Sequence, residues 1–88
     1  MRIEVTQADI DAGLRESCVA CPVALALHRA FPAADTIRAE YGVLWVWFGE
    51  ECRAASTPDE ASDFMGRFDG LRDVLPFAFD ADFGPLPA

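Results

Sequence analysis

Three cysteines are the residues of this chain best suited to carry out chemistry, and two of them, Cys18 and Cys21, form a C-x-x-C-P motif with Pro22. This spacing lets two thiolates share a metal ion, or lets one thiol attack the other in disulfide exchange. Cys52 lies far from the motif in the sequence. We therefore weigh a zinc site, a thiol-redox site and a purely structural role for these residues.

A zinc ion held by Cys18, Cys21 and Cys52 needs a fourth ligand, and His28 is the only histidine of the chain. If a helix begins at Cys21, His28 lies about 10 Å further along its axis. Ligands of one tetrahedral zinc lie within about 4 Å of each other, so His28 fits poorly. A closed zinc site would then require a ligand from another subunit.

In the redox interpretation, Cys18 precedes a helix N-terminus, where the helix dipole lowers a thiol pKa. A thioredoxin arrangement would place the motif directly after a core strand, whereas the segment 13–17 is polar and predicts a loop. The structural interpretation is favoured: Cys21 and Cys52 act as small buried hydrophobes, and Cys18 packs or caps a turn.

Few other residues could support catalysis. His28 is the only imidazole base that a serine or cysteine nucleophile could use, and the glycines are too isolated to form a phosphate-binding loop. The acidic pairs at 50–51 and 59–60 suit a hairpin tip and a helix start. We expect no catalytic residue and no enzyme activity.

The segment Val43–Phe48 is apolar on both faces of the strand that it predicts. Trp45 and Trp47 share one face, while Leu44, Val46 and Phe48 share the other. Two helices can cover only one face of a small sheet, and tryptophan is enriched at binding hot spots. Either loops or the tail cover the second face, or these five residues form an interaction surface for a second copy or another protein.

Periodicity places the remaining elements around this strand. It predicts strands at 2–5, 36–41, 52–54 and 74–80, a helical turn at 6–10, and helices at 21–30 and 58–71. Thr57 is expected to cap the last helix, with Leu71 and Leu75 facing the core. The order β-α-β-β-α-β predicts an α+β fold, with one antiparallel sheet and both main helices on one face, in its simplest form ferredoxin-like. We expect a single domain over 1–83 and a loose tail at 84–88.

Composition limits the partners. The chain has 88 residues and a formal charge of −8, and its seven bases are scattered arginines. Such a chain does not suit the phosphate backbone of a nucleic acid, which is bound by clustered bases. The longest apolar run is far shorter than the roughly 20 residues of a membrane-spanning helix. The N-terminus lacks a signal-peptide pattern, so we expect a cytoplasmic protein with reduced thiols.

Several segments resemble small uncharacterised proteins encoded by bacteriophages of GC-rich actinobacteria. The resemblance rests on Asp9, Ile10 and Gly13, followed by Cys18-x-x-Cys21 and the run 22–27 (PVALAL), with further similarity at 68–69 and 76–79. The absence of lysine and asparagine also fits a GC-rich genome. The resemblance implies a phage accessory protein acting in the host cell, and it supplies no catalytic residue.

Together these observations predict a small acidic phage protein that acts without catalysis, as a homodimer or by binding a host protein. One version is a mimic of DNA that occupies a basic site on such a protein. The alternative is a zinc or thiol-redox protein centred on Cys18 and Cys21, and with that exception we expect no cofactor.

Overall fold

The computed structural model describes residues 1–85, in which five strands and three helices form an α+β fold, as the sequence predicts. In chain order the elements are β1 (Arg2–Val5), α1 (Gln7–Ala12), α2 (Pro22–Ala30), β2 (Thr36–Ala39), β3 (Val43–Phe48), β4 (Glu51–Ser56), α3 (Asp59–Asp69) and β5 (Phe77–Asp80). Each strand begins or ends close to the predicted bounds, but β4 is twice as long as the predicted segment 52–54.

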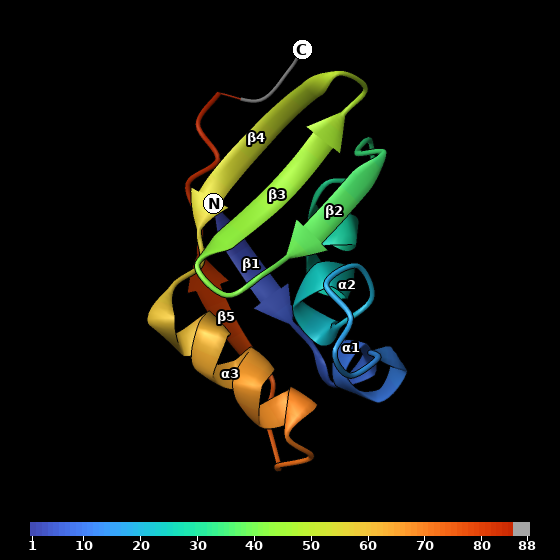
Figure 1. The fold of residues 1–88 in the computed structure, drawn as a ribbon, viewed down its shortest axis with the longest axis vertical. Coiled ribbons are helices and arrows are strands. Elements are labelled where there is room, and N and C mark those ends of the chain that lie inside the picture. Colours follow the sequence, from blue (N-terminus) through green and yellow to red (C-terminus); the bar gives the residue numbers. More distant parts are fainter. Residues whose placement is uncertain (86–88) are drawn as a thin grey trace.

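The strands form two antiparallel sheets rather than one. β1 pairs with β5, and β2, β3 and β4 form a second sheet with β3 at its centre. Figure 1 shows the three-stranded sheet in front, with β1 and β5 behind and below it. The expectation of a single ferredoxin-like sheet over the described residues is therefore wrong.

The length of β4 explains this division. In a ferredoxin-like sheet the first strand pairs with the third, so β1 would lie beside β3. β4 instead pairs with β3 along its full length, from Glu51 opposite Phe48 to Ser56 opposite Val43. The edge of β3 that β1 would need is occupied, and β1 pairs only with β5.

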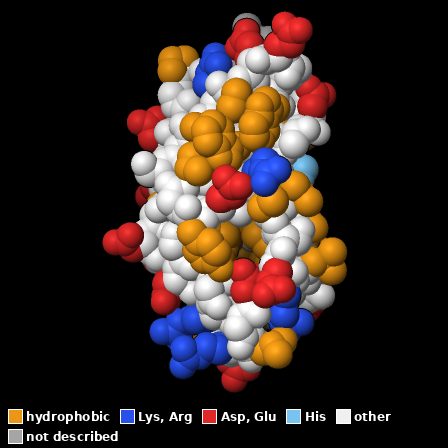
Figure 2. Space-filling model, in the orientation of Figure 1, with side chains coloured by type: hydrophobic (Ala, Val, Ile, Leu, Met, Phe, Trp, Pro, Cys, Tyr) orange, Lys and Arg blue, Asp and Glu red, His pale blue; other side chains and the backbone are white. Residues whose placement is uncertain are grey.

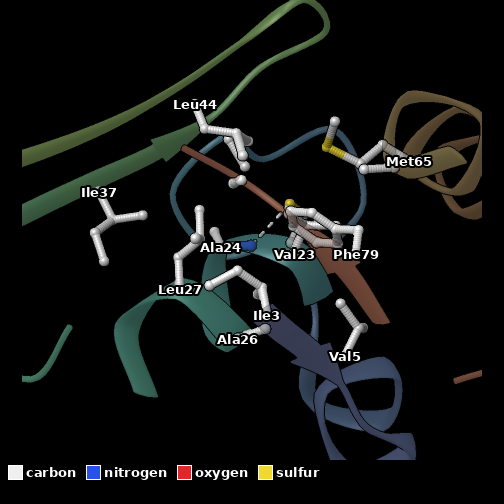
Figure 3. Close-up of a cluster of buried hydrophobic side chains, with 14 of the residues drawn as sticks. Ile3, Val5, Val23, Ala24, Ala26, Leu27, Ile37, Leu44, Met65 and Phe79 are labelled. Carbon is white, nitrogen blue, oxygen red and sulfur yellow. Dashed lines mark hydrogen bonds between the residues drawn. The ribbon is translucent and has the colours of Figure 1, made fainter. Parts of the chain in front are cut away.

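Helix α2 lies at the centre of the core and contacts both sheets. Pro22 at its first position is compatible with the helix because the missing N–H would have no intrahelical partner there. Val23 and Leu27 are fully buried, and Ala24 and Ala26 let neighbouring elements approach closely. Around them gather buried side chains from β1, β2, β3, α3 and β5, namely Ile3, Val5, Ile37, Leu44, Met65 and Phe79 (Figure 3).

Short helix α1 is attached to α2 through an ion pair. Thr6 and Asp9 form a capping box at the N-terminus of α1. The Asp9 carboxylate, which is buried, also accepts two hydrogen bonds from the half-exposed guanidinium of Arg29, at 2.7 and 2.8 Å. Arg29 donates a further bond to the Glu4 carbonyl at 2.7 Å, so one side chain ties α1 and β1 to α2.

Helix α3 buries Ala61, Phe64, Met65 and Phe68 on one face, but it differs from the prediction at both ends. Its N-cap is Pro58 with no side-chain cap, because the buried Thr57 hydroxyl donates instead to the Glu40 carbonyl at 2.7 Å. At the C-terminus the Leu71 N–H donates to Phe68 and the Arg72 N–H to the Arg67 carbonyl. These two bonds are the Schellman motif, which places Leu71 at the position usually held by glycine.

The chain changes direction at this helix end. As a result, the predictions for Leu71 and Leu75 and for the start of the last strand are wrong. Leu71 has φ +62° and is 73% exposed, and Leu75 is 80% exposed, so neither faces the core. Strand β5 starts only at Phe77, because Pro76 has no N–H to donate to a ladder. Of the expected tail, Pro85 accepts a hydrogen bond from Arg53, and residues 86–88 lie outside the described residues.

Replacing Asp9 by Asn tests the ion pair. The hydrogen bonds from Arg29 hold the pKa of Asp9 below its ordinary value of 3.8. A lowered pKa stabilises the fold at pH values above the unfolded pKa, and this contribution is lost as the pH falls below about 4. We expect Asp9→Asn to lower the free energy of unfolding at pH 7 by about 1–2 kcal/mol, a value reduced for the exposure of Arg29.

The measurement is urea unfolding between about pH 2 and pH 7. Asp11→Asn, on the exposed side of the same helix, should retain the wild-type acid sensitivity. Equal pH dependence of wild type and Asp9→Asn would show that this pair does not contribute to acid sensitivity.

Replacing Leu71 by Gly tests the strained helix end. Leucine at positive φ carries a steric cost that glycine avoids, whereas glycine adds entropy to the unfolded chain. We expect Leu71→Gly to raise the free energy of unfolding by about 0.5–1 kcal/mol. Leu75→Gly, an equally exposed position without positive φ, should not stabilise the protein, and a gain there as large as at Leu71 would contradict the argument.

Candidate functional site

The outer face of the three-stranded sheet carries the two tryptophans. Residues directly opposite in an antiparallel pair point to the same side of the sheet. We therefore define the tryptophan face by the residues that share a side with Trp45 and Trp47, namely Thr36, Arg38, Val43, Trp45, Trp47, Cys52, Ala54 and Ser56. Figure 2 shows hydrophobic side chains gathered over this sheet, on the side of the molecule away from α2.

The two indole rings stack on each other, and Trp45 is held in place by a charged neighbour. Their centroids lie 5.8 Å apart with an interplanar angle of 22°. The Trp45 indole N–H donates to the Glu40 carboxylate at 3.0 Å, and the other oxygen of Glu40 accepts a bond from Arg38 at 3.1 Å. Both rings remain half-buried, so each keeps surface available for a partner.

The opposite face of β3 is enclosed by the protein itself. Leu44 and Val46 are 0% exposed, and Phe48 packs edge-to-face on Phe31 with ring centroids 6.3 Å apart. The predicted interaction surface of five residues is therefore corrected. Leu44 and Val46 belong to the core, Phe48 lies at its margin, and the tryptophans alone lie on the open face.

The cysteines do not gather at one place. Cys52 lies opposite Trp47 on the tryptophan face, whereas Cys18 and Cys21 line a separate groove beyond the end of β2. Over residues 1–85 no three His, Cys, Asp or Glu side chains come together in a way that could hold a metal ion. The proposed zinc ligands Cys18, Cys21 and Cys52 thus do not come together around one metal ion. His28 is exposed on α2.

Cys21 has a structural role that the sequence only partly suggests. It is the N-cap of α2, and its thiol accepts a hydrogen bond from the Ala24 N–H at 3.5 Å (dashed line in Figure 3). Burial raises the pKa of the Cys21 thiol above its ordinary value of 9.0. A buried thiol held protonated is a weak nucleophile, and Cys18 is the more accessible member of the pair.

The groove beside these cysteines has a volume of about 640 Å³. We call its buried lining residues Cys21, Ala39 and Met65 the floor, and its more exposed lining residues Glu16, Glu40, Tyr41 and Asp69 the rim. The lining residues are Glu16, Ser17, Cys18, Cys21, Ala39, Glu40, Tyr41, Met65 and Asp69. Its acidic residues come from a loop, from the end of β2 and from the end of α3.

Asp69 holds the elements around the groove together. One carboxylate oxygen accepts a hydrogen bond from the Tyr41 hydroxyl and the other from the Glu16 N–H, both at 2.8 Å. The bond to Asp69 raises the pKa of Tyr41 to about 12. Sequence analysis missed this groove because its residues lie 28 and 53 positions apart, and no local pattern links them.

Comparisons of the chain with protein-family models, with curated proteins and with solved structures found no match. Among the described residues, no helix is long and apolar enough to cross a membrane.

Thiol labelling tests the different environments of the cysteines. In folded protein exposed briefly to iodoacetamide, we expect Cys18 to react at least tenfold faster than Cys21, because Cys21 is buried and its pKa is raised. Peptide mass spectrometry measures the extent at each site, and labelling in denaturant should remove the difference. Equal rates in the folded protein would contradict the burial of Cys21.

Proposed function

We propose that this protein acts without catalysis, as an interaction protein that associates with a second copy of itself through the tryptophan face. The observation that carries the proposal is the pair of stacked, half-buried tryptophans on the uncovered side of β3. Tryptophan contributes more to protein–protein binding than most residues, because a large rigid ring buries much area at low entropic cost.

The charge distribution favours a second copy on this face. The chain carries −8 overall, yet the tryptophan face bears only Arg38, which is neutralised by its bond to Glu40. Two copies can therefore meet here without opposing net charge, whereas most other surfaces of the molecule would repel each other. Association between identical faces about a two-fold axis is also the commonest form of oligomer.

The size of the face limits the strength of this association. Strands β2, β3 and β4, of four, six and six residues, cover at most roughly 14 by 20 Å. This area is below the roughly 800 Å² that each partner contributes to a standard interface. We therefore propose a reversible dimer that exchanges with monomers, which leaves the same tryptophans able to bind a host protein.

We further propose a phage origin and a place in the host cytoplasm. The support is the resemblance of the segments around Cys18–Leu27 and 76–79 to actinobacteriophage proteins, together with the lysine-free composition. The net charge of the chain disfavours direct contact with nucleic acid and favours protein partners that carry basic surfaces.

Removing the indole rings tests the proposed dimer. In sedimentation equilibrium from roughly 10 μM to 1 mM, we expect the average mass of the wild type to rise toward that of a dimer. Trp47→Ser should weaken self-association by roughly tenfold or more. Leu75→Ser, which removes an exposed hydrophobic side chain elsewhere, should behave as the wild type.

Circular dichroism of each variant verifies that the fold is retained. A wild type that keeps the monomer mass over the whole range would refute the dimer. So would a Trp47→Ser variant that associates as strongly as the wild type.

A further inference from the structure

We propose that the groove beside Cys18 and Tyr41 binds the side chain of an arginine presented by a basic segment of a partner protein. This site is distinct from the tryptophan face and does not depend on the proposed dimer. The proposal rests on three properties of the groove: its size, its apolar floor and the charge around its rim.

The size and floor of the groove suit a long side chain. A volume of about 640 Å³ lies within the range of small-ligand sites in proteins, and it exceeds what a single ion would fill. Ala39, Met65 and Cys21 form the apolar floor. The methylene stem of an arginine can lie on such a surface while its charged end reaches the rim.

The rim of the groove complements a guanidinium group. Three acidic residues, Glu16, Glu40 and Asp69, line it, and of these Glu40 is already paired with Arg38. Both oxygens of Asp69 already accept one hydrogen bond each, but a carboxylate offers about four acceptor positions, so each oxygen can accept another. Arginine presents several donors in one plane and can reach two such acceptors at once.

Tyr41 adds an aromatic surface to the same rim. The residue is 59% exposed, and its hydroxyl is fixed by the bond to Asp69. A guanidinium that approaches Asp69 can therefore also stack on the phenol ring, an interaction that lysine makes less well. In Figure 2, hydrophobic and acidic side chains border a hollow below the tryptophan face.

Two arginines adjoin lining residues in the sequence, and neither pairs with Glu16 or Asp69. Arg38 pairs with Glu40, and Arg15 lies over the Phe68 ring, with 5.3 Å from its guanidinium carbon to the ring centroid. Neither residue lines the groove. The rim consequently keeps a negative charge that a basic partner would neutralise.

A titration with short peptides tests the proposal. The probe is the blocked pentapeptide Gly-Ser-Arg-Ser-Gly, and its twin carries citrulline, which has nearly the same shape without the charge. Binding to the labelled protein is followed through amide chemical shifts. We expect the arginine peptide to bind with a Kd of about 1 mM, with shifts concentrated at 16–18, 39–41 and 65–69, and the citrulline peptide to bind at least roughly fivefold more weakly.

Matched variants separate a specific site from general attraction to an acidic protein. Asp69→Asn and Asp73→Asn remove the same charge, but only Asp69 lines the groove. We expect Asp69→Asn to weaken binding at least roughly fivefold and Asp73→Asn less than twofold. Tyr41→Phe keeps the ring and releases one Asp69 oxygen, so it should bind at least as tightly as the wild type, whereas Tyr41→Ser should bind more weakly.

Three results would overturn the proposal: shifts spread over the whole surface, equal losses in the two aspartate variants, or equal binding of both peptides. The spectra themselves show whether each variant is folded. Trp47→Ser should bind the arginine peptide as the wild type does, so that failure of the dimer and failure of the groove are recognised separately.

Discussion

The packing of both sheets on one helix is the constraint on which the rest of this structure depends. A chain of 88 residues has a single core, and α2 lies at its centre with Val23 and Leu27 fully enclosed. β1 directs Ile3 and Val5 toward it, and the three-stranded sheet directs Ile37 and Leu44 toward it (Figure 3). Both sheets turn one face to α2, and α3 packs Phe64 against Phe77 of β5, so none of the described helices covers the outer face of β3 (Figure 1). The open position of the tryptophans therefore follows from the way the core is built.

The sequence predicts the local elements of this fold well and their assembly poorly. The helical turn at 6–10, the helix at 21–30 and the strand Val43–Phe48 depend on neighbouring residues, and the structure has each of these elements close to its predicted bounds. The division into two sheets depends on whether β1 or β4 occupies one edge of β3, which is a competition between segments far apart in the chain. The sequence of β4, with charges at Glu51 and Arg53 and few large apolar residues, predicts a short edge strand. The turn before it instead sets a register that pairs all six residues with β3.

For the candidate sites too, the sequence predicts local features well and their assembly poorly. Alternation alone identifies which residues share a face with Trp45, because one strand contains the whole pattern. It cannot decide which face is covered, and Leu44 and Val46 prove to be core residues only once α2 is in place. The groove cannot be predicted from the alternation of residues at all. Glu16, Tyr41 and Asp69 meet because the Schellman turn ends α3 beside the loop before α2, and nothing near each residue in the sequence indicates that meeting.

Because of ion pairing, the tryptophan face and the groove differ in net charge. Over the described residues, Arg2, Arg29, Arg38, Arg53 and Arg67 each form an ion pair with an acidic side chain. The bases thus neutralise particular acids, and the remaining acids determine the field of the molecule. Glu40 stands between the two surfaces, since it lines the groove and also bonds to Arg38 and to the Trp45 indole. The charge of Glu40 is therefore matched by Arg38, and the negative field at the groove comes from Glu16 and Asp69, neither of which forms an ion pair over the described residues.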